Sequence, residues 1–209
     1  MPTLLVVNSS PFLETSVSRH LTDEFVQNWK QANPNGRVIT RDLTASDLKT
    51  IDAAWVGAAY TPKDARTAEQ NKTLALSDTL LAELKTADEY VFGVPMHNFA
   101  VPSVLKLWID QIARVGETFA YVDGAPKGLL QGKRATFLVA SGGAYGAGTA
   151  MASFNHVEPY LRSVFGFLGV TDTNFLSAGG AAALMYGQVD RATFLQPHVE
   201  AIRSQFTAA

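Results

Sequence analysis

The feature that most constrains the fold is a regular alternation of short apolar runs, rich in β-branched residues, with longer segments of helical periodicity. Runs of strand length occupy residues 3–9, 37–43, 89–95, 135–141 and 171–179. Segments with apolar residues at helical spacing occupy about 17–33, 67–87, 102–115, 154–169 and 188–206. Strands that are joined through helices run in the same direction. The alternation therefore predicts an α/β fold, a doubly wound sheet of five parallel strands with helices on both faces.

The size and composition of the chain fit one domain that spans residues 1–209, because domains of this class reach roughly 200–250 residues. The net charge of −2 shows no bias toward nucleic acid or an anionic membrane, so the expected partner is a small molecule. The chain has no cysteine, which excludes disulfides, thiolate metal sites and a cysteine nucleophile. Residues 1–7 show no basic leader, and no run of ~18 apolar residues occurs. We expect a cytoplasmic protein.

Three predicted strands end in polar or glycine-rich segments, and ligands of open α/β sheets bind beyond such ends. The first segment, NSSPFLETSVSRH at residues 8–20, carries five hydroxyl groups and no lysine or arginine before Arg19. Backbone amides, hydroxyls and the positive end of a helix dipole can hold a phosphate dianion without a cationic side chain. Helix capping by Thr15 or Ser16 is the alternative. The glycine patterns of dinucleotide-binding and P-loop folds are absent.

The second segment, PMHNF at residues 95–99, places polar and aromatic groups at the mouth of a buried strand. Its backbone can face a planar ring, with Asn98 as a hydrogen-bonding group and Phe99 as a stacking or packing surface. A single histidine, His97, is weak evidence of catalysis. We expect no metal site, because metal-ligand spacing is absent from the other histidines, His20, His156 and His198.

The third segment, ASGGAYGAG at residues 140–148, contains four glycines that permit positive φ and a close backbone approach to a flat ligand. A flexible loop is the alternative explanation. The carboxyl ends of parallel strands lie at one edge of a sheet, so the three segments should meet there. One FMN molecule would suit all three, since its phosphate fits the first segment and its ring system fits the other two.

Two further segments carry structural predictions. The apolar face of residues 102–115 includes Trp108, which should face either the core or a partner chain. Residues 117–132 contain Asp-Gly and Ala-Pro turn signals, which predict an excursion with a short hairpin before the fourth strand.

The chain resembles a known family along essentially its whole length. The matching motifs are VVNSS with the following SVS, LALSDTLLAELKTAD, PMHNF, TFAYVDGAPKGL, GGAYGAG and PYLRSVFGFLGVTD. In these motifs it is similar to the FMN-dependent NADH-azoreductases, a branch of the flavodoxin-like quinone reductases. The resemblance implies a flavodoxin-like fold, bound FMN, NADH or NADPH as co-substrate, and a homodimer with the flavin sites at its interface.

The resemblance also implies which residues bind the cofactor. Those that would hold the phosphate and the ribityl chain are Ser10, Ser16, Val17 and Ser18. Those that would contact the isoalloxazine ring are Met96, His97, Asn98 and Phe99. Those that would line its other rim are Ser141, Gly142 and Gly143.

The chain departs from the family pattern at three places. The family commonly has Ser-Arg before the glycine pair, whereas this chain has Ala140-Ser141 and lacks the arginine. Val17 stands where a glutamine is frequent, and Gly180 where a glutamate is frequent. These departures leave open the choice between NADH and NADPH and the activity on bulky azo dyes.

The implied reaction is a two-step hydride relay from a nicotinamide through FMN to a quinone, azo or nitroaromatic acceptor. The cofactor carries the hydride, and the protein supplies orientation and electrostatics. His97 and Tyr121 are candidate proton donors. Phe119, Tyr121 and Phe165 are candidates for the pocket wall, with core packing as the alternative for Phe165. A flavodoxin-type electron carrier and a non-enzymatic flavin-binding regulator are the competing functions.

Overall fold

The computed structural model describes residues 1–207, which form one five-stranded sheet and a separate hairpin. The strands of the sheet are β1 (Thr3–Asn8), β2 (Arg37–Asp42), β3 (Glu89–Pro95), β6 (Arg134–Ala140) and β7 (Asp172–Ala178). Their order is β2-β1-β3-β6-β7, and every neighbouring pair is parallel. The helices are α1 (Val17–Ala32), α2 (Ala53–Tyr60), α3 (Ala68–Thr86), α4 (Ser103–Ile112), α5 (Val157–Leu168), α6 (Ala182–Met185) and α7 (Arg191–Thr207). This arrangement confirms the predicted fold.

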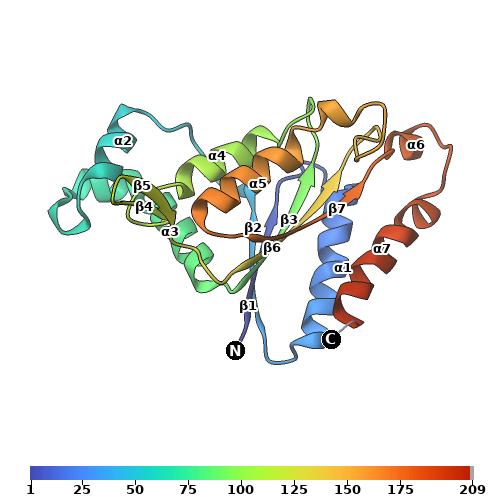
Figure 1. The fold of residues 1–209 in the computed structure, drawn as a ribbon, viewed down its shortest axis with the longest axis horizontal. Helices are drawn as coiled ribbons and strands as arrows, with labels where there is room; N and C mark the ends of the chain where they lie inside the picture. The colour runs from blue at the N-terminus through green and yellow to red at the C-terminus, as the bar shows by residue number, and fades with distance from the viewer. Residues whose placement is uncertain (208–209) are drawn as a thin grey trace.

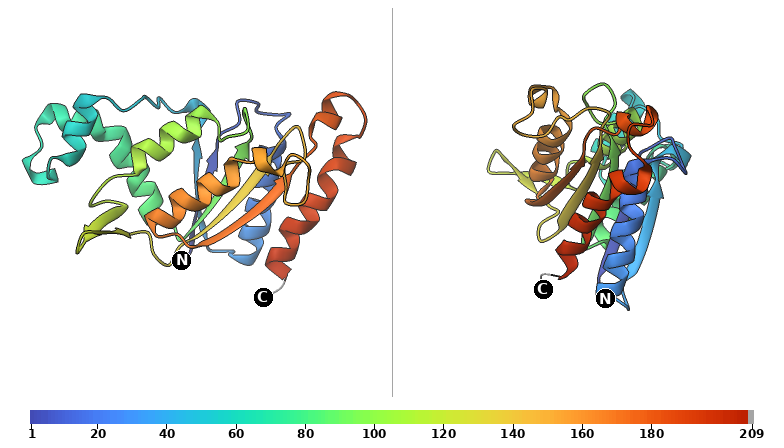
Figure 2. Two further views of the ribbon diagram at one scale, coloured as in Figure 1. Left: turned by 45° about the horizontal axis from the view of Figure 1, so that its top comes forward. Right: turned by 90° about the vertical axis from the view of Figure 1, so that its right-hand side faces the viewer.

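The sheet is the middle layer of three (Figures 1 and 2). Helices α1 and α7 lie side by side on one face, and α3, α4 and α5 cover the other. Successive residues of a strand point to opposite faces, so Leu4 and Val6 pack beneath α1 and α7, whereas Leu5 and Val7 enter the opposite core. All four side chains are buried, which explains why β1 reads as a continuous apolar run.

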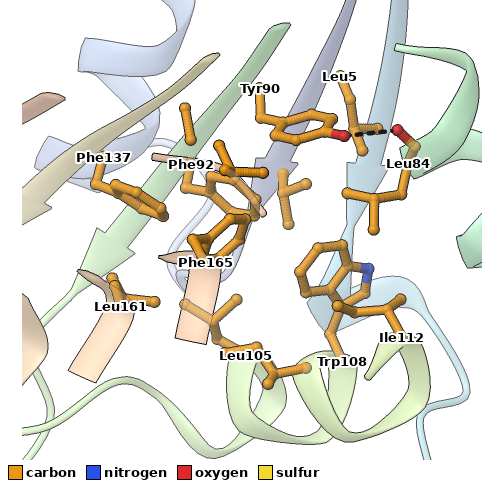
Figure 3. Close-up of a cluster of buried hydrophobic side chains, with 14 of the residues drawn as sticks. Leu5, Leu84, Tyr90, Phe92, Leu105, Trp108, Ile112, Phe137, Leu161 and Phe165 are labelled. Atoms are coloured by element: carbon orange, nitrogen blue, oxygen red, sulfur yellow. Dashed lines mark hydrogen bonds between the residues drawn. The ribbon is translucent and has the colours of Figure 1, made fainter. Parts of the chain in front are cut away.

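An aromatic cluster holds the centre of the sheet in place (Figure 3). The ring of Phe92 on β3 lies 5.0 Å from that of Phe137 on β6, 5.1 Å from that of Phe165 and 5.5 Å from that of Trp108. Phe165 and Trp108 are fully buried, so both belong to the core of this chain. The apolar face of α4 is thus buried within its own chain. Phe165 belongs to the core and does not form a pocket wall.

The strand order reverses between β1 and β3. The chain passes from β1 to β2 on one side and then returns to place β3 on the other side of β1. Connections that diverge in this way leave a crevice beyond the carboxyl ends of the two strands, and ligands of doubly wound folds bind there. The first two polar segments follow these two strands, so the topology brings them to the crevice.

The connection between β2 and α3 contains structure that the sequence pattern did not predict. Helix α2 and two 3₁₀ turns, Leu43–Ala45 and Lys63–Ala65, fill it. The α2 sequence AAWVGAAY is apolar on all sides, so it gives no amphipathic signal. Among residues 1–207, no helix combines the length and the apolar character needed to cross a membrane.

The excursion before the fourth sheet strand is a hairpin, as predicted. Its strands are β4 (Phe119–Val122) and β5 (Ala125–Gly128), which pair antiparallel. The turn residues Asp123 and Gly124 have φ values of 52° and 79°, and two consecutive positive φ angles suit a type I′ turn. The predicted helix boundaries differ in three places: α4 ends at Ile112, α5 begins at Val157 after a 3₁₀ turn, and α7 begins at Arg191.

Candidate functional site

A cavity of about 800 Å³, called here the candidate cavity, lies at the carboxyl edge of the sheet where β1, β3 and β6 end. Small-molecule sites typically occupy roughly 300–1,000 Å³. The predicted residues that line it are Ser10, Ser16, Val17, Ser18, Met96, His97, Ser141 and Gly142. The predicted residues that lie beside it without lining it are Asn98, Phe99 and Gly143. The three polar segments therefore converge on one cavity.

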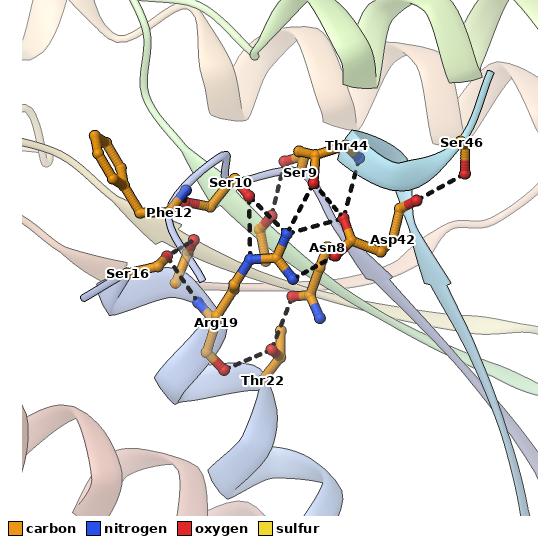
Figure 4. Close-up of polar contacts among 12 residues, drawn as sticks. Asn8, Ser9, Ser10, Phe12, Ser16, Arg19, Thr22, Asp42, Thr44 and Ser46 are labelled. Carbon is orange, nitrogen blue, oxygen red and sulfur yellow. Dashed lines mark hydrogen bonds and ion pairs between the residues drawn. The ribbon is translucent and has the colours of Figure 1, made fainter. Parts of the chain in front are cut away.

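The end of β1 is anchored by buried hydrogen bonds (Figure 4). Thr22 Oγ1 donates to Asn8 Oδ1 at 2.9 Å, and Ser9 Oγ donates to the Gly93 carbonyl at 2.8 Å. Position 93 requires glycine, because a Cβ there would come within 2.7 Å of Asn8 Oδ1. These contacts tie the strand end to α1 and β3, and the next residue, Ser10, reaches the candidate cavity.

The start of α1 supplies hydrogen-bond donors to the same end of the cavity. Ser16 caps the helix, since its Oγ accepts the N–H of Arg19 at 3.2 Å and lies 3.2 Å from Ser18 Oγ. The N–H groups of Val17 and Ser18 belong to the first turn, which has no intrahelical acceptors for them. Capping and cavity lining thus coexist at Ser16. Hydroxyls and free amides at the positive end of a helix form an anion-binding arrangement.

Arg19, the basic residue nearest to this loop in sequence, is occupied elsewhere (Figure 4). Its Nη1 forms an ion pair with Asp42 Oδ2 at 2.8 Å, and its Nε and Nη2 donate to the Ser10 carbonyl at 3.1 and 2.6 Å. Burial raises the pKa of Asp42, but hydrogen bonds from Arg19 and Thr44 outweigh it and hold that pKa below its usual range. The guanidinium of Arg19 is therefore engaged by Asp42 and by the Ser10 carbonyl, and it stabilises the loop through these bonds.

The segment after β3 forms a tight turn with an unusual backbone. The N–H of His97 donates to the Ala100 carbonyl and the N–H of Ala100 to the His97 carbonyl, both at 3.0 Å. The residues between them, Asn98 and Phe99, have φ values of 48° and 70°, in the left-handed region that L-residues seldom occupy. Such strain persists where neighbouring contacts enforce it, and it is concentrated at functional sites.

The side chain of Phe99 faces the third segment. Its ring lies 5.9 Å from that of Tyr145 and 5.1 Å from that of Phe154. The turn is also tied to β6, because the Met96 N–H donates to the Ala140 carbonyl at 2.7 Å. Met96 and His97 are the members of the turn that line the candidate cavity.

A fourth wall, residues 181–191, was not predicted. Its lining side chains are Ala181, Leu184, Met185, Val189, Asp190 and Arg191. The N–H groups of residues 180–182 donate to the carbonyls of residues 141–143 at 2.9–3.1 Å, which fixes this wall against the third segment. The available sequence signal was the pair Gly179-Gly180 after β7, since the end of that strand reaches the same edge of the sheet.

The fold and the polar edge have counterparts among known proteins. Residues 2–206 match the family model described as "Flavodoxin-like fold". An FMN-dependent NADH:quinone oxidoreductase from Acidobacterium capsulatum is 59% identical over 203 residues, which are 97% of this chain and 98% of that protein. The chain belongs to this flavodoxin-like family. A second member, FMN-dependent NADH:quinone oxidoreductase 3 from Burkholderia lata, is 51% identical over the same shares of the two chains.

A solved structure supports the same assignment of family and fold. It is the FMN-dependent NADH-azoreductase from Bacillus anthracis str. Ames Ancestor in complex with FMN, which is 28% identical to this chain. The two structures align with a TM-score of 0.86 over 99% of this chain and 98% of that one. The predicted family and fold are thereby confirmed.

Within this flavodoxin-like chain, Tyr121 lies away from the candidate cavity. It is on the β4–β5 hairpin, at the opposite end of the molecule from α6 (Figure 1), and is 65% exposed. Phe119 on the same hairpin packs on Phe167, with 4.7 Å between their rings. Of the two candidate proton donors, only His97 lines the cavity of its own chain.

Proposed function

We propose that this chain binds FMN in the candidate cavity and uses NADH or NADPH to reduce quinones, azo compounds and nitroaromatics by two-electron hydride transfer. The observation that carries the proposal is the cavity itself, with buried hydroxyls and the start of α1 at one end and the turn of Met96 and His97 at the other. The names of the relatives from Acidobacterium and Burkholderia, which describe FMN-dependent NADH:quinone oxidoreductases, support it.

The residues present fit FMN. Ser10, Ser16 and Ser18 are buried and line the cavity, so their hydroxyls are available to a phosphate that is withdrawn from bulk water. Val17 and Ser18 add amides at the positive end of the α1 dipole. The remaining walls are mostly apolar and the volume of about 800 Å³ leaves room for a ring system beside the phosphate end.

FMN, when bound, supplies the hydride chemistry, while the protein orients the reactants and sets the electrostatics. Met96, His97 and Gly142 would hold the ring, with Asn98, Phe99 and Gly143 shaping the turns behind them. His97 lines the cavity, and its imidazole would donate a proton to the acceptor as the acceptor is reduced.

The protein would act as a cytoplasmic homodimer with the flavin sites at the interface. The resemblance supports this assembly, but α4 does not, because its apolar side chains are buried in their own chain. Support comes instead from two large apolar side chains that the single chain leaves exposed at the candidate cavity, Phe12 and Met185, which both line it. Exposed groups of this kind mark interaction surfaces when they lie together.

The proposal is tested by an anaerobic visible spectrum of the protein with FMN, recorded before NADH, after NADH and again after a quinone. We expect bleaching by NADH and recovery on addition of the quinone. Binding of FMN without bleaching would favour an electron carrier or a flavin-binding regulator. No binding of FMN would refute the assignment of the cavity.

A further inference from the structure

We propose that Arg191, the first residue of α7, supplies the positive charge at the phosphate end of the candidate cavity and thereby selects FMN over riboflavin. The inference rests on the proposed function, since it concerns the same cavity. The sequence places no cation in the hydroxyl-rich segment before Arg19. The tertiary structure brings one in from a position 176 residues away from Thr15.

The contacts of Arg191 place it at the start of α1. Its Nη1 donates to the Thr15 carbonyl at 2.8 Å, and its Nη2 donates to the Ser16 carbonyl at 3.0 Å. A guanidinium has five N–H donors in a fixed plane, so three remain after these two bonds. Arg191 is half-buried and lines the candidate cavity together with Ser10 and Ser18.

The charge of Arg191 is not neutralised by a neighbouring carboxylate. Both of its partners are backbone carbonyls, and it forms no ion pair with any of residues 1–207. Arg19, in contrast, is paired with Asp42. The carboxylate of Asp190 also lines the cavity, but it accepts hydrogen bonds from the N–H and Oγ1 of Thr193 at 2.9 and 2.6 Å, as the cap of α7.

Two effects follow from this placement. The guanidinium holds the carbonyls that precede the first turn of α1 and so positions the amides and hydroxyls of that turn. It also adds a positive charge at the end where the phosphate, which carries close to two negative charges at pH 7, would lie. Riboflavin has the ribityl chain but no phosphate, so the charge should not contribute to its binding and the positioning effect should contribute less than it does for FMN.

The test compares dissociation constants of FMN and riboflavin, measured by flavin fluorescence, for the apoprotein and for Arg191→Met. We expect the affinity for FMN to fall by about tenfold or more and that for riboflavin to change little. Arg191→Lys should recover part of the loss, because it keeps the charge but not the planar fork. The affinity of Arg191→Met for FMN should also depend less on ionic strength.

The matched control is Arg203→Met on the same helix. Arg203 pairs with Glu24 at 3.5 Å and does not line the candidate cavity, so both flavins should bind as to the unmodified protein. Equal losses of FMN and riboflavin in Arg191→Met, or no loss of either, would overturn the inference while leaving the proposed function standing. An unmodified protein that binds neither flavin would overturn both.

Discussion

Replacing Ser16 by alanine removes a hydroxyl that has two separable roles. Its Oγ caps α1 through the Arg19 N–H at 3.2 Å, and the same side chain lines the candidate cavity. Loss of a serine cap costs about 0.5–2 kcal/mol of unfolding free energy. We expect the Ser16→Ala apoprotein to lose about 1 kcal/mol of stability in guanidinium chloride unfolding.

The effect of Ser16→Ala on cofactor binding should be larger. A hydrogen bond to a charged group contributes about 1.5–3 kcal/mol, which corresponds to roughly a 10- to 150-fold change in Kd. The Kd of FMN should rise by a factor in this range, whereas the Kd of riboflavin, which has the ribityl chain but no phosphate, should rise much less. Fluorescence titration of the apoprotein with each flavin measures both values.

The chain offers a matched control for Ser16→Ala in Thr67. It caps α3 with the same geometry, since its Oγ1 accepts the Gln70 N–H at 3.2 Å, but it does not line the candidate cavity. Thr67→Ala should lose similar stability and keep its affinity for FMN. Unchanged FMN binding in Ser16→Ala would refute the phosphate assignment. A comparable loss of FMN in Thr67→Ala would show that lowered stability, and not a missing hydrogen bond, weakens binding.

Three further outcomes are expected. His97→Ala should change the rate of NADH-dependent quinone reduction, as followed by stopped-flow, while the visible spectrum shows flavin still bound; an unchanged rate would contradict its role as proton donor. Asp42 has a folded-state pKa below the usual 3.8, because hydrogen bonds to the carboxylate outweigh the effect of burial. The stabilising contribution of the Asp42 carboxylate is therefore present above about pH 4 and lost as the pH falls through the folded-state pKa. The difference in unfolding free energy between the unmodified protein and Asp42→Asn should shrink in acid. A difference that stays constant with pH would count against the pairing of Asp42 with Arg19. Gly128→Ala would place a Cβ 2.2 Å from the Gly169 nitrogen and should cost about 1–3 kcal/mol with a lower Tm, whereas Gly57→Ala, which meets nothing within 4 Å, should not.

Much of the fold followed from local pattern because strands and helices report their own periodicity. The ends of each predicted sheet strand lie within about one residue of those observed. The Asp123-Gly124 pair, which favours a tight turn, predicted the hairpin correctly. Helix α2 was missed because an apolar, alanine-rich segment has no polar face to reveal its period. The tight turn after β3 was located by its residue types, but its two left-handed residues, Asn98 and Phe99, are enforced by contacts with residues 100 and 156 that no local pattern contains.

The sequence by itself determined which segments would meet at the site. Parallel strands joined by helices present all their carboxyl ends at one edge, so the ends of β1, β3 and β6 had to be neighbours there. Only the tertiary structure decided what completes the cavity. The wall at residues 181–191, the bonds from Arg191 to the loop before α1, and the distance of Tyr121 from the cavity of its own chain depend on how α7 packs on α1 and where the hairpin lies. Contacts between residues some 175 positions apart arise from that packing, and a local sequence pattern has no means of encoding them.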